Sequence, residues 1–253
     1  MIRRLAAAAI LLGLWTLAWA LAGQLDFILP PPWRVAAALW NDRDLLAHHA
    51  AITLLEIVVG LGVGVGLGVA AALSLALWRP AALWLWPLFV ATQALPVFAI
   101  APLLVLWLGY GMASKIAMAA LIIFFPVASG FYDGLRRTDP DLLDLARTMN
   151  ARPLAVLLRL RVPAALPGLA SGLKVGAAVA PIGAVVGEWV GSSAGLGFLM
   201  LHANARLQVP LMFAALFLLA VMAIVLHAAI AAGLRRALPW VHDTLDDQPH
   251  ARD

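Results

Sequence analysis

The chain has no cysteine and few charged residues, and both shortages restrict what it can be. Without cysteine it has no disulfide, no thiol nucleophile and no cysteine-ligated metal. Charged residues make up only 12% of the sequence, whereas hydrophobic residues make up 64%. Soluble domains are about half apolar and about a quarter charged. Because several windows exceed the ~18 apolar residues that mark a membrane helix, the composition predicts an all-α polytopic membrane protein.

Common nucleotide-binding and catalytic motifs are also missing. The segment GLASGLK at 168–174 comes nearest to a phosphate-binding loop, but it lacks the Gly-Lys pair and lies in an apolar span. No G-x-S-x-G motif occurs. His48 and His49 are adjacent, a poor spacing for two metal ligands on one helix. We therefore expect a chain that is not an enzyme and binds no metal or cofactor.

Six apolar segments are predicted to cross the membrane, within one transmembrane domain that covers 1–253. They lie at about 5–22, 51–77, 83–108, 114–132, 166–190 and 209–233. The first resembles a secretory signal in its basic start, but its apolar run exceeds the ~7–15 residues of such signals and further spans follow. The polar tail at 239–253 is predicted to be disordered.

The basic residues predict the orientation of these spans, because cytoplasmic connections carry an excess of Lys and Arg. With the N-terminus in the cytoplasm, the cytoplasmic side holds Arg3, Arg4, Arg79, Arg136, Arg137, Arg147, Arg152, Arg159, Arg161, Arg235, Arg236 and Arg252. The other side holds Arg34, Arg43, Lys115 and Arg206. We therefore expect both termini to be cytoplasmic, together with the connection between the fourth and fifth spans.

Glycine and proline recur inside the spans. Gly60, Gly64 and Gly68 fall on one face of the second span, where small residues let another helix approach closely. The third span contains prolines at 87, 96 and 102, so it must bend or be supported by its neighbours. Broken helices at membrane depth often line a pathway, although proline is frequent in membrane helices.

The cytoplasmic connection contains the charged segment DLLDLARTMNARPLAVLLRLRVPAALP, residues 141–167. Asp139 is predicted to cap a helix that begins at Pro140. The apolar residues of this helix recur at helical spacing: Leu142, Leu145, Ala146 and Met149. Asn150 tolerates the left-handed turn that ends a helix. A second helix is then predicted from Pro153 to Val162-Pro163.

This amphipathic helix pair has four interpretations. It can lie on an anionic lipid surface, form a solvated loop, bind DNA, or dock on a soluble partner by placing its apolar ridge in a groove. Its position between two spans argues against DNA.

The same segment resembles a signature of ATP-binding-cassette (ABC) importer permeases. That signature reads glutamate-alanine-alanine, three residues, glycine, nine residues, isoleucine, one residue, leucine-proline. Here Asp144, Leu145 and Ala146 are followed at matching spacing by Asn150, Leu160 and Val162-Pro163. The resemblance implies a type I ABC importer permease fold, with a coupling segment at 134–165. Its coupling residues would be Asp144, Leu145, Ala146, Met149, Asn150, Leu160 and Pro163.

Other stretches resemble the subgroup that imports nitrate, taurine, sulfonates and hydroxymethylpyrimidine. They include QALPVFAIAPLLVLWLGYG and GAVVGEWVGSSAGLG, the latter most similar to members for pyrimidine precursors of thiamine. The resemblance implies a bacterial inner-membrane homodimer, a cytoplasmic subunit that uses ATP, and an external binding protein. Taurine, alkanesulfonate or nitrate are the alternative cargoes. An ion-driven secondary transporter and a membrane scaffold are the alternative functions.

Polar residues inside spans are candidates for a substrate pathway. We expect Glu188 and Trp189 to line this pathway. Gly187 and Gly191 would allow a neighbouring group to approach Glu188 closely. The alternative is that Glu188 and Trp189 form a pair at the membrane–water interface. Gln93 can contact a polar heterocycle or form an interhelical bond. A structural partner is predicted for Glu56, and His227 is predicted to be a core residue.

Overall fold

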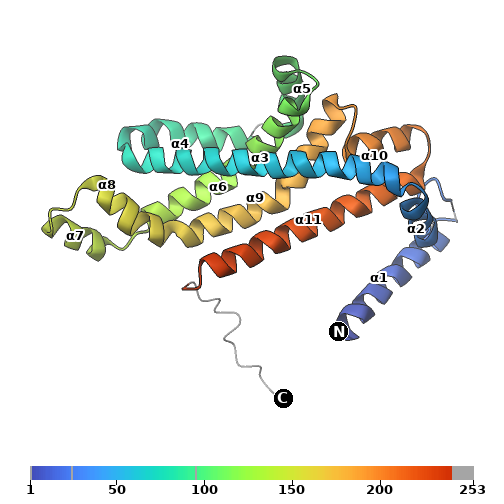
Figure 1. Cartoon of the computed structure of the whole chain (residues 1–253), viewed down its shortest axis with the longest axis horizontal. Coiled ribbons are helices and arrows are strands. Elements are labelled where there is room, and N and C mark those ends of the chain that lie inside the picture. The colour runs from blue at the N-terminus through green and yellow to red at the C-terminus, as the bar shows by residue number, and fades with distance from the viewer. Residues whose placement is uncertain (1, 24, 95, 241–253) are drawn as a thin grey trace. The chain divides into compact units, whose positions relative to one another are not determined.

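The computed structural model describes residues 2–23, 25–94 and 96–240, and every regular element in this part of the chain is helical. The elements are α1 (Ile2–Leu21), α2 (Pro32–Asn41), α3 (Arg43–Leu77), α4 (Arg79–Ala94), α5 (Val97–Leu108), α6 (Met112–Arg136), α7 (Pro140–Thr148), α8 (Pro153–Val156), the π-helical turn η1 (Leu157–Arg161), α9 (Val162–Gly191), α10 (Leu196–Ala205) and α11 (Val209–Ala237) (Figure 1). The all-α class is confirmed. Most of the predicted tail, 241–253, lies outside the described residues.

Four helical segments in the described part of the chain are long and apolar enough to cross a membrane. They are Arg43–Leu77, Met112–Arg136, Pro153–Gly191 and Val209–Ala237. They correspond to the second, fourth, fifth and sixth predicted spans, and each is longer than its prediction. The first predicted span corresponds to α1, whose apolar part, Ala9–Leu21, is shorter.

The third predicted span, 83–108, is two helices in the structure. α4 and α5 contain 16 and 12 residues, each below the ~20 that span a bilayer. Pro96 stands at the N-cap of α5, and a proline there has no N–H to continue a helix from α4. Pro87 and Pro102 remain inside their helices. The predicted interruption of this span by proline is therefore present, and at Pro96 it separates two helices.

The chain forms two compact units, each assembled from three separated stretches. The first contains Met1–Val63, Leu95–Ile122 and Val179–Ile224. Its main apolar core joins α2, the start of α3, α10 and the first half of α11. Trp15 of α1 packs against this core and donates a hydrogen bond to the carbonyl of Pro30 over 3.1 Å.

The second unit contains Gly64–Ala94, Ile123–Ala178 and Val225–Asp253. Its core joins the end of α3, α6, η1 and the start of α9, around the fully buried Phe131 and Leu135. Close contact between α6 and α9 depends on glycine: a Cβ added to Gly130 would lie 2.6 Å from the carbonyl oxygen of Gly168. A Cβ on Gly134 would lie 2.9 Å from Ala165 Cα. Small residues one turn apart thus let the two backbones touch.

The predicted glycine face of α3 is confirmed at two positions, one in each unit. A Cβ on Gly60 would lie 2.5 Å from Ala119 Cβ in the first unit. In the second unit, a Cβ on Gly68 would lie 3.0 Å from the carbonyl oxygen of Phe124. Both neighbours belong to α6, so this face packs α3 against α6.

Candidate functional site

The connection between α6 and α9 folds as two short helices joined by a turn, α7 and α8 (Figure 1). Asp139 is the N-cap of α7, and its carboxylate accepts a hydrogen bond of 2.9 Å from the backbone N–H of Asp141. Pro140 and Pro153 begin the two helices. Asn150 has a φ of 53°, the left-handed conformation predicted for it. The cap, the turn and both helix starts are therefore confirmed.

The predicted end of the second helix at Val162-Pro163 is wrong. Pro163 is the second residue of α9, and the helical path continues from α8 through η1 to Gly191. Proline lacks an N–H, and its ring clashes with the carbonyl four residues earlier in an α-helix. Here the preceding turn is widened, and the N–H of Val162 donates to the carbonyl of Leu157, five residues back. The wider turn accommodates the proline without ending the helix.

An apolar groove of about 310 Å³ lies between α7 and α8, in the second unit. Its lining is Leu142, Leu145, Ala146, Met149, Ala151, Ala155, Val156, Arg159 and Leu160. The rim is exposed, because Leu145 is 56% and Met149 74% accessible. Four of the predicted coupling residues, at 145, 146, 149 and 160, therefore share one surface, which we call the coupling groove.

The other predicted coupling residues lie away from this surface. Asp144 pairs with Arg147 over 2.6 Å in an exposed ion pair. Such exposed pairs contribute roughly 0–1 kcal/mol, so its main effect is to give α7 a charged face. Asn150 shapes the turn and Pro163 belongs to α9.

A second group of functional candidates is buried in the first unit. We call it the polar cluster: His49, Thr53 and Glu56 of α3, Lys115 of α6 and Glu188 of α9. Each of these residues is buried. Glu188 is only 1% exposed, whereas Trp189 is 42% exposed. The two side chains therefore do not form the interfacial pair that the sequence offered as an alternative.

Three residues of the polar cluster cap the start of α10. Gly195 has a φ of 109° and its backbone N–H donates to His49 Nδ1 over 2.9 Å. The N–H of Leu196 donates to Thr53 Oγ1 over 2.7 Å. Glu188 Oε2 accepts from the N–H of Gly197 over 2.5 Å and from that of Phe198 over 3.3 Å. Side chains from α3 and α9 thus satisfy the donors that a helix start leaves free.

The remaining contacts join the cluster together. Thr53 donates its hydroxyl hydrogen to Glu188 Oε1 over 2.6 Å. Glu56 is 1% exposed and its Oε2 has no hydrogen-bond partner within the described part of the chain, so the structural partner predicted for Glu56 stays a prediction. Lys115 lies near Glu56 and donates to the carbonyls of Tyr110 and Gly111 over 2.8 and 2.9 Å. Both oxygens of Glu188 are therefore occupied by protein donors.

The other polar and aromatic residues predicted inside the spans lie in different surroundings. Trp189 is exposed, with its ring centroid 6.4 Å from that of Phe98. The side chain of Gln93 lies outside the described residues. Close packing near Glu188 is confirmed, because a Cβ on Gly187 would lie 3.1 Å from Lys115 Cα. His227 is exposed in α11, so its prediction as a core residue was wrong.

Sequence reasoning missed His49 and Thr53. Their signal was present, since residues 49, 53 and 56 follow the i, i+4, i+7 spacing of one helix face. This polar stripe in an apolar helix predicts a common polar partner. The identity of that partner was not predictable from spacing, because Thr53 and Glu188 are 135 residues apart.

Replacing Thr53 with valine tests the capping role. The change keeps the shape of the side chain but leaves the N–H of Leu196 and one oxygen of Glu188 without their partner. A buried unsatisfied group costs about 1–3 kcal/mol. We expect a lower melting temperature in detergent and faster hydrogen exchange at residues 195–198. Ser74→Ala is the control, because its hydroxyl bonds only to Ala70 of its own helix; equal exchange in both variants would refute the role.

Comparison with known proteins supports a transport function. One family model, described as binding-protein-dependent transport system inner membrane component, matches residues 64–238. A probable ABC transporter permease protein of Haemophilus influenzae is 52% identical over 221 residues, covering 87% of this chain and 90% of that protein.

Two similar proteins have names that state a cargo. The formylaminopyrimidine transport permease protein ThiX of Halalkalibacterium halodurans is 34% identical over 231 residues, which cover 91% of this chain and 92% of that protein. The riboflavin transport system permease protein RibX of Chloroflexus aurantiacus is 41% identical over 231 residues, which cover 90% of this chain and 85% of that protein.

Solved structures support the same fold. The methionine ABC transporter MetNI, in an inward-facing conformation, matches with a TM-score of 0.62 and 19% identity over 82% of this chain and 97% of that chain. The fold is that of an ABC importer permease, a transport subunit without enzymatic activity. With the family model covering more than half of its residues, the chain belongs to the family of binding-protein-dependent transport system inner membrane components.

Proposed function

We propose that this permease binds its ATPase subunit through the coupling groove and imports a small nitrogen heterocycle. The exposed apolar rim of the groove carries the first part of the proposal. Leu145 and Met149 lie one helical turn apart, as do the anchors of a helix that enters a partner's groove. Large side chains that stay this exposed on a short helix are typical of a contact surface.

The geometry also suits the transmission of movement. Asn150 fixes the angle between α7 and α8 by its left-handed conformation. From Pro153 the helix continues for 39 residues to Gly191, about 58 Å at 1.5 Å per residue. A displacement of the coupling segment, 134–165, is therefore passed to α9 without an intervening loop. Rocking of packed helices then gives alternating access.

The orientation of the chain follows from its basic residues. The coupling segment contains Arg147, Arg152, Arg159 and Arg161, and their number favours the cytoplasmic side. This is the side on which an ATPase meets its ATP. The proposal therefore places both termini in the cytoplasm, and a second permease copy and an external binding protein complete the importer.

The cargo is proposed to be hydroxymethylpyrimidine or a related thiamine precursor. The support is the segment around Glu188 and the similarity to a formylaminopyrimidine permease. Riboflavin is a second candidate, because a riboflavin permease is 41% identical to the chain. Gln93 and Trp189 remain proposed pathway residues; Glu188 is proposed to act through the loop it holds, since its oxygens are occupied.

Replacing Met149 with glutamate tests the docking surface. A charge at an interface core loses its water without gaining a partner, so we expect the affinity for the ATPase to fall at least about tenfold, equivalent to about 1.4 kcal/mol. The variant is expected to insert normally and to fail in ATP-driven uptake. Arg147→Gln changes the net charge by the same amount on the other face of α7 and is expected to transport normally. Normal uptake by Met149→Glu would refute the docking surface.

Uptake by cells with and without this gene tests the cargo. We expect loss of labelled hydroxymethylpyrimidine uptake in the deletion strain, with riboflavin, taurine and nitrate as parallel substrates. Loss of riboflavin uptake alone would identify riboflavin as the cargo in place of the pyrimidine. Loss of taurine or nitrate uptake would contradict both proposed cargoes. An ion-driven transporter would instead retain uptake when the ATPase is inactivated.

A further inference from the structure

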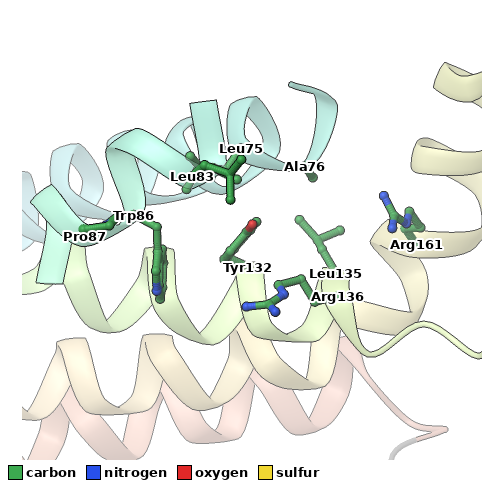
Figure 2. Close-up of a pocket in the computed structure, with 10 residues that line it drawn as sticks. Leu75, Ala76, Leu83, Trp86, Pro87, Tyr132, Leu135, Arg136 and Arg161 are labelled. Atoms are coloured by element: carbon green, nitrogen blue, oxygen red, sulfur yellow. The ribbon is translucent and has the colours of Figure 1, made fainter. Parts of the chain in front are cut away.

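A cavity in the second unit has a chemistry that the transport proposal does not use. Its volume is about 690 Å³, and it lies among the end of α3, the first half of α4, the end of α6 and η1 (Figure 2). Two arginines, Arg136 and Arg161, line it together with Trp86 and Tyr132. The lining contains no acidic residue among those that the structure describes.

Arg161 has an unused donor inside the protein. Its Nε is buried and has no hydrogen-bond partner within the described ranges. Buried donors of charged groups are nearly always paired, because an unpaired one loses its water without compensation. Figure 2 shows Arg161 at the end of the cavity opposite Trp86. The orphaned donor therefore calls for an acceptor that the protein itself does not supply.

Arg136 adds a second positive charge to the same cavity. Its guanidinium carbon lies 5.6 Å from the centroid of the Tyr132 ring, a cation–π contact. The ion pairs found in the described part of the chain involve Arg34, Arg43 and Arg147. Neither arginine of the cavity is therefore neutralised there by a carboxylate.

The rest of the wall is apolar and lies at helix ends. Leu75, Leu83 and Trp86 contribute it. Leu75 is two residues from the end of α3, and Arg136 is the last residue of α6. Helix ends lie near the level of lipid headgroups, and basic pockets there bind anionic headgroups. The cavity combines a cationic part for a headgroup with an apolar part for a hydrocarbon chain.

We propose that this cavity binds an anionic phospholipid. Its phosphate oxygens accept hydrogen bonds from Arg161 and Arg136, and an acyl chain packs against Leu75, Leu83 and Trp86. Guanidinium groups match the geometry of phosphate oxygens, and the volume falls within the range of about 300–1,000 Å³ typical of ligand sites. Free phosphate offers the same oxygens but leaves the apolar wall uncovered. The proposal goes beyond the transport function and is independent of the cargo.

Native mass spectrometry of the full chain in detergent tests this site. The protein is titrated with phosphatidylglycerol, and with phosphatidylcholine of the same acyl chains. We expect phosphatidylglycerol to bind at least tenfold more tightly than phosphatidylcholine, and Arg161→Gln to lose that preference. Arg236→Gln is the matched control, because Arg236 is an exposed arginine of α11 that does not line the cavity.

A second variant tests the space in the cavity independently of its positive charge. Ala76→Phe fills the space without removing an arginine and is expected to weaken phosphatidylglycerol binding equally. If Arg161→Gln does not fold, the Ala76→Phe variant and the comparison of the two lipids still test whether the cavity binds an anionic phospholipid. Equal affinity for both lipids, or unchanged binding in Ala76→Phe, would overturn the proposal. Displacement of phosphatidylglycerol by millimolar inorganic phosphate would overturn it in favour of a free anion.

Discussion

The bilayer requires every backbone N–H and C=O in its hydrocarbon region to be paired within the protein, and this constraint determines the rest of the structure. Long helices meet it along their length, as α3, α6, α9 and α11 do. It is hardest to meet where a helix begins, ends or contains proline. At those places the structure uses side chains and altered turns: the π-helical turn before Pro163 and the polar cluster at the start of α10.

The polar cluster shows why an apolar protein keeps buried acids. The loop before α10 has no capping side chain of its own, since its N-cap is Gly195. That position has no room for a side chain, because a Cβ there would overlap the carboxylate of Glu188. Glu188, Thr53 and His49 supply the acceptors from two other helices of the same unit. A single set of hydrogen bonds therefore satisfies the helix start and fixes three helices to one another.

Much of the fold was predictable because its signals are local. Hydropathy located the four long helices, and the cap at Asp139, the turn at Asn150 and the helix start at Pro153 follow from residues within a few positions. Nonlocal features were not predictable. The partner of Thr53 is 135 residues away, and the cavity that Arg161 and Trp86 both line depends on how α4 packs in its unit. Pro163 misled the prediction because a helix can widen by one residue per turn instead of ending.

The central claim is that the coupling groove is covered by the ATPase subunit, and thiol labelling in native membranes tests it most directly. Because the chain has no cysteine, Met149→Cys carries a single thiol. The account predicts that this thiol is protected from a maleimide while the ATPase is bound and reacts after the ATPase is stripped away. Arg147→Cys, on the opposite face of α7, should react in both states. Equal labelling of Met149→Cys with and without the ATPase would contradict the account.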